Sequence, residues 1–168
     1  EPFFEEPGKA LVKSFLANAS RTYNERYAFS FNFYSYFDPN IPLDIGTTSE
    51  CKQAIRKGAC WQRNCTIPEY VALARNKTQQ LTGRSDYIFW VGEVGWSTPQ
   101  SSTLSTQLAR CKDWSSKDTF RAFYGGYLGW DLGIANARPP DHVFYFTMRD
   151  SKNFGLDEHF GLVEGCAD

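Results

Sequence analysis

One carboxylate, Glu93, stands in a setting that suits catalysis. It follows an apolar run from Tyr87 to Val91 without polar alternation, as in a strand buried on both faces of a parallel sheet. Glycines flank it, and Trp96 follows three residues later. A carboxylate at the C-terminal end of a buried strand, beside an aromatic surface, is typical of glycosidic-bond-cleaving sites in barrels. The alternative from these residues alone is an acid that caps a turn or pairs with an arginine.

A second set of polar and aromatic side chains lies in residues 27–37, the segment YAFSFNFYSYF. Its phenylalanines alternate with Ser30, Asn32, Tyr34 and Tyr36, which predicts a strand with one apolar face and one polar or aromatic face. In a barrel, the polar face would point toward the axis near the mouth. In an antiparallel sheet it would be half exposed to solvent, and the alternation by itself favours this second arrangement.

The rest of the chain predicts helices between three strands. Strands are expected at 27–37, 87–94 and 143–148, with helices at 7–18, at about 47–58, and at 66–82, where Gly83 ends the third one. Further helices are expected at 102–112 and 119–127, and residues 129–140 form a loop. The order predicts strand–helix–strand units within one domain spanning residues 1–168.

Composition and motifs exclude several classes of function. The chain has 168 residues and a formal net charge of −1, so nothing indicates a nucleic-acid or anionic-membrane partner. It has no apolar run long enough for a membrane span, no phosphate-binding glycine loop and no CxxC pair with a histidine partner. We therefore expect no cofactor and no metal.

The cysteines and sequons indicate a secreted glycoprotein. There are five cysteines; Cys60 and Cys65 are expected to form one disulfide, and the odd number leaves one thiol free or bonded to another chain. Three sequons begin at Asn18, Asn64 and Asn76, and each is a candidate glycosylation site.

Three segments in register resemble glycoside hydrolase family 17, the β-1,3-glucanase-like enzymes. FNFYSYFDPNIPLD resembles the family's sixth strand, and VGEVGWST resembles the seventh, where the nucleophilic Glu is followed by Gly-Trp after one residue. VFYFTMRDSK and then EHFGLV resemble the eighth strand and the closing segment. The resemblance implies an α/β fold that is the C-terminal portion, about strands six to eight, of a (β/α)8 TIM barrel.

The resemblance also implies roles for individual residues in a retaining β-1,3-glucan hydrolase. Glu93 is the expected nucleophile, and Asn32 and Tyr34 are expected to orient it and the sugar hydroxyls. Candidate stacking surfaces are Tyr36, Phe37 and Trp96. Asp150 is expected as a charged neighbour of the substrate, the remaining member of an acidic pair whose second position is Ser151 here.

The sequence departs from the family in three further ways. Gly92 replaces the usual Ser before the nucleophile, and Ser97 replaces the Pro after the Trp. Strands one to five, including the Asn-Glu that supplies the general acid, are absent, so we expect a second polypeptide or a longer precursor to carry them. Closure of two copies into one barrel fits less well, because six strands do not reproduce the eight-strand geometry. The alternatives are a non-catalytic glucan-binding or structural glycoprotein, or an unrelated small secreted α+β protein.

Overall fold

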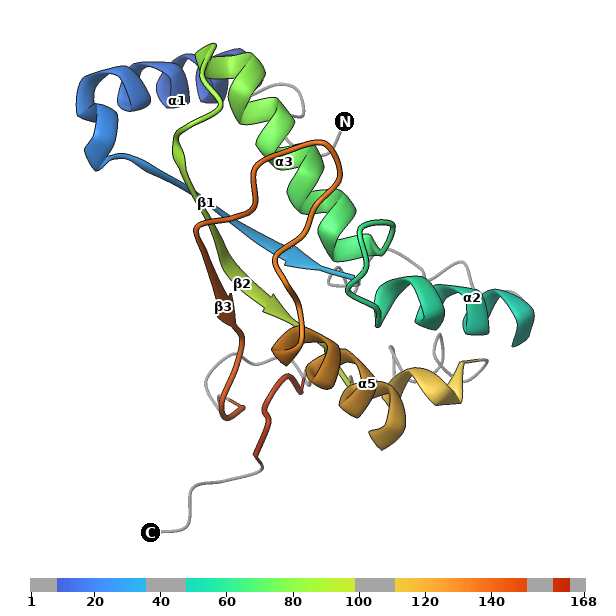
Figure 1. The fold of residues 1–168 in the computed structure, drawn as a ribbon. Helices are drawn as coiled ribbons and strands as arrows, with labels where there is room; N and C mark the ends of the chain where they lie inside the picture. Colours follow the sequence, from blue (N-terminus) through green and yellow to red (C-terminus); the bar gives the residue numbers. More distant parts are fainter. Residues whose placement is uncertain (1–8, 36–47, 99–110, 151–158, 164–168) are drawn as a thin grey trace, which may run out of the picture.

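The computed structural model describes residues 9–35, 48–98, 111–150 and 159–163. Figure 1 shows helices packed beside a small sheet. The helices are α1 (Lys9–Tyr23), α2 (Thr48–Gly58), α3 (Thr66–Thr82) and α5 (Lys117–Leu128), and the strands are β1 (Ala28–Tyr34), β2 (Ile88–Gly95) and β3 (His142–Tyr145). Two short 3-10 turns, η1 (Asn24–Arg26) and η2 (Lys112–Ser115), complete the described elements.

The sheet is parallel, with the order β1-β2-β3. The strand predicted at 87–94 is therefore central, and the mixed α/β class is confirmed. Helices α2 and α3 connect β1 to β2, and α5 lies between β2 and β3. Among the described residues, β1 and β3 each have a single neighbour, so both edges of the sheet are unpaired there.

The helices cover one face of the sheet, here called the helical face (Figure 1). Phe89, Val91 and Val94 of β2 are 0% exposed and belong to the same core cluster as Ile67 and Val71 of α3. The opposite side of the sheet is called the open face. Ser30 and Asn32 on β1 are exposed there, so the alternation along β1 does separate an apolar from a polar face.

Local signals place the helix ends. The side chain of Ser116 accepts a hydrogen bond from the backbone N–H of Thr119, so α5 begins two residues before the predicted start. Gly83 ends α3 as expected, with a φ of 72° that favours glycine. The predicted strand 143–148 forms only to Tyr145, and most of the helix predicted at 102–112 lies outside the described residues.

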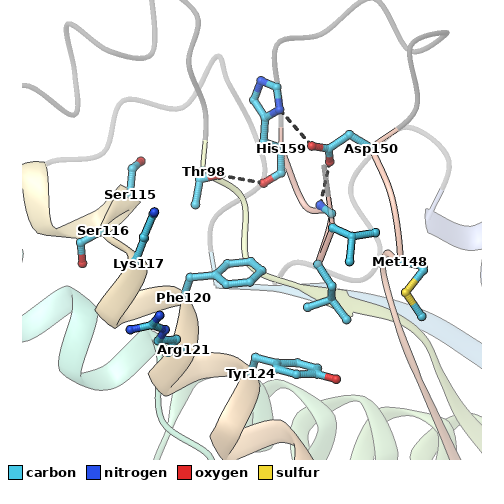
Figure 2. Close-up of a pocket in the computed structure, with 13 residues that line it drawn as sticks. Thr98, Ser115, Ser116, Lys117, Phe120, Arg121, Tyr124, Met148, Asp150 and His159 are labelled. Carbon is cyan, nitrogen blue, oxygen red and sulfur yellow. Dashed lines mark hydrogen bonds and ion pairs between the residues drawn. The ribbon is translucent and has the colours of Figure 1, made fainter. Parts of the chain in front are cut away.

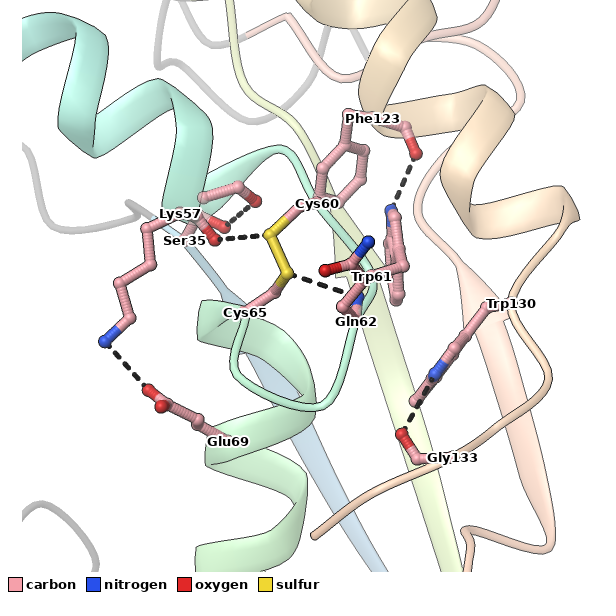
Figure 3. Close-up of a disulfide and its surroundings, with 11 residues drawn as sticks. Ser35, Lys57, Cys60, Trp61, Gln62, Cys65, Glu69, Phe123, Trp130 and Gly133 are labelled. Atoms are coloured by element: carbon pink, nitrogen blue, oxygen red, sulfur yellow. Dashed lines mark hydrogen bonds and ion pairs between the residues drawn. A yellow bond between two sulfur atoms is a disulfide. The ribbon is translucent and has the colours of Figure 1, made fainter.

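Two disulfides tie the helical layer together. One joins Cys60 to Cys65, as the sequence predicts, and closes the loop before α3 (Figure 3). The other joins Cys51 of α2 to Cys111, across a separation of 60 residues. Cys166 lies outside the described residues. Disulfides favour an oxidising compartment, which is consistent with the predicted secretion.

A buried arginine joins α3 to the start of two strands. The Arg75 side chain is 3% exposed and donates hydrogen bonds to the backbone oxygens of Tyr87, Arg138 and Pro139. It also contacts the carboxylate of Asp141 at 3.4 Å. That carboxylate accepts the backbone N–H of Phe89 at 2.8 Å, so the network sets where β2 begins next to the loop that precedes β3.

This network predicts a pH-dependent contribution to stability. Burial raises the pKa of Asp141, but the hydrogen bond from Phe89 and the charges of Arg138 and Arg75 outweigh it, so the net pKa lies below the ordinary value. As the pH falls, the Asp141 carboxyl therefore takes up a proton in the unfolded chain before it does so in the folded chain. The free energy of unfolding decreases through the acid range as a result.

We therefore expect Asp141→Asn to destabilise the protein most at neutral pH. The difference in unfolding free energy from wild type should shrink below about pH 4, measured by urea unfolding across pH 2.5–7. Asp118→Asn, at an exposed carboxylate, is the matched control and should leave the pH profile unchanged. A difference from wild type that is constant with pH would contradict the assignment.

Helix α1 leaves an apolar stripe uncovered among the described residues. The sequence predicts Leu11, Val12, Phe15 and Leu16 on one face, yet Leu11 is 76% and Phe15 is 67% exposed. Only Leu16 packs against the core cluster. Within the described part of the chain, no helix is both long enough and apolar enough to cross a membrane.

Candidate functional site

Glu93 lies near the carboxyl end of the central strand, on the open face. The Tyr34 hydroxyl donates a hydrogen bond to Glu93 Oε2 at 2.6 Å. Both side chains are half-buried. The residues that the sequence predicts to act together are therefore in direct contact, and the tyrosine fixes one oxygen of the carboxylate.

A β-bulge at Gly92 turns Glu93 to this face. Phe31 pairs with Val91 and Asn32 pairs with Glu93, so β2 carries one extra residue against β1. The same shift occurs against β3 between Val91 and Val94. Because side chains alternate along a strand, the extra residue lets Val91 and Val94 both enter the core while Glu93 points away from it.

Gly92 leaves space for side chains of the neighbouring strand. A Cβ at position 92 would lie 2.4 Å from Ser30 Oγ and 2.9 Å from Asn32 Oδ1. Both distances are shorter than a Cβ atom can approach an oxygen without displacing it. The Ser30 hydroxyl thus occupies the space that a serine at position 92 would need. Asn32, also on β1, lies next to Glu93 as predicted.

Asp150 has a structural role that the sequence did not predict. Its Oδ1 accepts the backbone N–H groups of Phe160 (2.8 Å) and Gly161 (2.7 Å), and its Oδ2 lies 3.0 Å from His159 Nδ1. The carboxylate therefore fixes the segment 159–161, and its predicted contact with substrate stays a prediction. His159 is part of the same structural anchor.

Phe160 is a site residue that motif reasoning did not single out. It is 4% exposed and packs edge-on against Tyr34, with ring centroids 5.2 Å apart. It also contacts Phe146 beyond β3. Asp150 therefore supports Tyr34 indirectly, through Phe160. The sequence feature that points to Phe160 is the closing EHFGLV segment, which contains it.

Trp96 is not a stacking surface for substrate. It is 1% exposed and stacks on Trp114 with ring centroids 4.2 Å apart. The indole Nε1 of Trp96 donates to the Trp114 carbonyl oxygen, and that of Trp114 donates to the Ser97 carbonyl oxygen. This prediction is wrong, because Trp96 points into the helical core on the side opposite Glu93.

The other predicted residues stay untested or lie outside the described part. Tyr36 and Phe37 fall in the undescribed segment 36–47. The asparagines of the three sequons, Asn18, Asn64 and Asn76, are all exposed, which glycosylation requires, and their modification remains a prediction. In the described ranges no cluster of three or more His, Cys, Asp or Glu side chains is suited to a metal ion.

A cavity of about 630 Å³ lies between α5 and the segment after β3. Figure 2 shows Phe120 and Tyr124 of α5 facing Asp150 and His159 across it. Asp150, the one carboxylate among the described residues that line it, accepts hydrogen bonds from two backbone N–H groups. Glu93 is not among the described residues that line this cavity, so the cavity is separate from the catalytic candidate.

Comparison with known proteins identifies no relative. No family model matches the chain. Neither the curated proteins nor the solved structures contain a match. The Glu93 site and the resemblance of the three sequence segments remain as indications of function.

Proposed function

We propose that this chain supplies the nucleophile of a retaining glycoside hydrolase that acts on β-1,3-linked glucan. The observation that carries the proposal is the hydrogen bond from Tyr34 to Glu93 near the carboxyl end of the central parallel strand. Parallel α/β sheets place catalytic groups at this end of the strands. The resemblance supplies the substrate class.

The proposed reaction has two steps. A Glu93 oxygen attacks the anomeric carbon, the glycosidic C–O bond breaks, and a general acid protonates the leaving oxygen. The same acid, now a base, then removes a proton from water, which attacks the anomeric carbon and releases Glu93. Retaining enzymes hold the two carboxyl groups about 5–5.5 Å apart, so the partner carboxylate belongs above the open face.

The remaining strands are proposed to come from polypeptide outside these 168 residues. β1 and β3 have unpaired edges among the described residues, and free edges of this kind are usually protected. Phe144 on β3 is 50% exposed beside Trp90, with ring centroids 6.0 Å apart. Together with Leu11 and Phe15 of α1, these apolar surfaces support a companion segment that completes the barrel and brings the general acid.

Tyr34 is proposed to orient the nucleophile, and Tyr34→Phe tests this role. The change removes only the hydroxyl, while the ring still packs on Phe160. A hydrogen bond to a charged group contributes about 1.5–3 kcal/mol, so kcat should fall about 10- to 100-fold. Steady-state kinetics should show the loss in kcat rather than in KM, and the thermal midpoint should stay near that of wild type.

Tyr127→Phe is the control for Tyr34→Phe, because the Tyr127 hydroxyl bonds the Val143 carbonyl on the helical side. It should keep wild-type kcat. An unchanged kcat in Tyr34→Phe would contradict the orienting role.

A non-catalytic glucan-binding protein is the second candidate. Asp150 is engaged with backbone, and Ser151 replaces the second member of the family's acidic pair. Loss of one acidic site neighbour fits a protein that binds glucan without cleaving it.

Hydrolysis by the complete secreted protein distinguishes the two candidates. The protein is incubated with β-1,3-, β-1,4- and β-1,6-linked glucans, and the first-formed anomer is followed by proton NMR. We expect cleavage of the β-1,3-glucan with a β-anomer as the first product. Binding without cleavage would favour the second candidate, and an α-anomer would exclude retention.

A further inference from the structure

A second cavity, of about 510 Å³, lies in the helical layer between the loop after α2 and the end of α5. Two indoles meet there: the rings of Trp61 and Trp130 have centroids 5.0 Å apart. Trp61 is 7% exposed and Trp130 is half-buried. Trp61 belongs to the core cluster and Trp130 packs against it, and Figure 3 shows Trp61 beside Phe123 of α5. Glu93 belongs to the open face of the sheet.

Both indoles are held in place by hydrogen bonds. Trp61 Nε1 donates to the Phe123 carbonyl oxygen at 2.7 Å, and Trp130 Nε1 donates to the Gly133 carbonyl oxygen at 3.3 Å. Trp61 also packs against the rings of Phe123 and Tyr127. A ligand that stacks on this surface would meet rings that are already ordered, which lowers the entropic cost of binding.

Two glycines of the cavity lining, Gly126 and Gly129, differ in the room that they leave for a side chain. A Cβ at Gly126 would lie 2.4 Å from Trp61 Cδ1, so this position does not accept a side chain without displacing the ring. Gly129 also lines the cavity, and a Cβ there would meet only carbonyl oxygens at 3.5 Å and 3.9 Å. Position 129 therefore has room for a side chain but carries none.

The rim of the cavity is polar and carries charges of both signs. It includes the amide of Gln62, the guanidinium of Arg63 and the carboxylate of Asp131, all on exposed residues. Asp131 Oδ1 accepts the Gly133 N–H at 2.8 Å, which leaves its second oxygen for a ligand. Among the described residues of the rim, one positive and one negative charge balance, so the rim favours a neutral ligand rich in hydroxyl groups over an anion.

We propose that this cavity is a second saccharide-binding site, remote from Glu93, that takes a neutral oligosaccharide. A pyranose ring lies with its apolar face against Trp130 while its hydroxyls reach Gln62, Arg63 and Asp131. Aromatic walls with a few fixed polar groups are the usual composition of small-ligand sites. Only the choice of β-glucan as the saccharide rests on the proposed function. The site would hold a glucan chain on one side of the molecule while Glu93 acts on the other.

The test changes two residues that line the cavity. Gly129→Leu adds a side chain at the lining, and Gly125→Leu is the matched control, because a Cβ at Gly125 meets nothing within 4 Å and the residue is not among those that line the cavity. Trp130→Ala is the second variant. All are made in the complete secreted protein, and retention on gels containing neutral β-1,3-glucan or an acidic polysaccharide is compared.

We expect Gly129→Leu and Trp130→Ala to weaken retention by neutral glucan at least about fivefold. Hydrolysis of a short soluble oligosaccharide and the thermal midpoint of Gly129→Leu should remain at wild-type values, and Gly125→Leu should bind as wild type. Wild-type retention in Gly129→Leu, or stronger retention by the acidic polysaccharide, would overturn the site. If hydrolysis is absent but Gly129→Leu still loses binding, the proposed function fails and this site stands.

Discussion

Glu93→Gln should reduce hydrolysis of β-1,3-glucan by the complete protein by at least about 10³-fold, with glucan binding preserved. The substitution keeps the size of the side chain and an oxygen that can accept the Tyr34 hydroxyl, but it removes the nucleophile. Loss of a nucleophile costs several orders of magnitude in kcat because the covalent intermediate no longer forms. Initial rates of reducing-sugar release measure the effect.

The control for this experiment is Glu69→Gln. Glu69 lies in the first turn of α3 and pairs with Lys57 at 2.9 Å on the surface. The Glu69→Gln substitution removes the same charge as Glu93→Gln, but away from the proposed site of reaction. Its rate of glucan hydrolysis should therefore match that of wild type. A Glu93→Gln rate within about tenfold of wild type would mean that Glu93 is not the nucleophile.

The largest expected effect on stability comes from Arg75→Met. Methionine preserves much of the length of the arginine side chain but leaves the carbonyl oxygens of Tyr87, Arg138 and Pro139 without their donor. It also leaves Asp141 with one cation fewer. Removing one partner from a buried charged network costs about 3–5 kcal/mol, and the free energy of unfolding should fall by that amount in urea titrations.

Arg121→Met is the matched control for Arg75. Its guanidinium is 78% exposed and lies 3.9 Å from Asp118, and exposed pairs of this kind contribute little. Its unfolding curve should superimpose on that of wild type. A loss below about 1 kcal/mol in Arg75→Met would show that the network is dispensable.

The strands and most helices follow directly from sequence pattern. The unbroken apolar run before Glu93 predicts a central parallel strand, and β2 is that strand. Alternation in residues 27–37 predicts the two faces of β1 but favours an antiparallel neighbour, whereas β1 is parallel to β2. Alternation reports which side chains are buried and carries no information on strand direction.

Side-chain direction explains why one predicted site residue was wrong. Glu93 and Trp96 are three residues apart along an extended segment, and an odd separation places two side chains on opposite faces. Trp96 instead shares its face with Val94, and both are buried. Proximity in sequence suggested a shared site, although the parity of the spacing already argued against it.

Contacts across the fold were beyond the sequence alone. The one-residue shift at Gly92 relative to both neighbouring strands, the pairing of Cys51 with Cys111 and the packing of Phe160 on Tyr34 each join distant segments. No local pattern specifies them, because they depend on strand register and on how the helices pack. The structural role of Asp150 escaped prediction for the same reason, because its partners lie ten and eleven residues later.

Covalent trapping tests the central claim most directly. The complete protein is incubated with a 2-deoxy-2-fluoro-β-glucoside that carries a good leaving group. The fluorine slows both steps and the leaving group speeds only the first, so the glycosyl-enzyme ester accumulates. Intact mass and peptide mapping then locate the added sugar. We predict one fluoroglucosyl group on Glu93 and its absence in Glu93→Gln. A label on a different residue, or no label on a protein that cleaves glucan with retention, would contradict the assignment of Glu93 as the nucleophile.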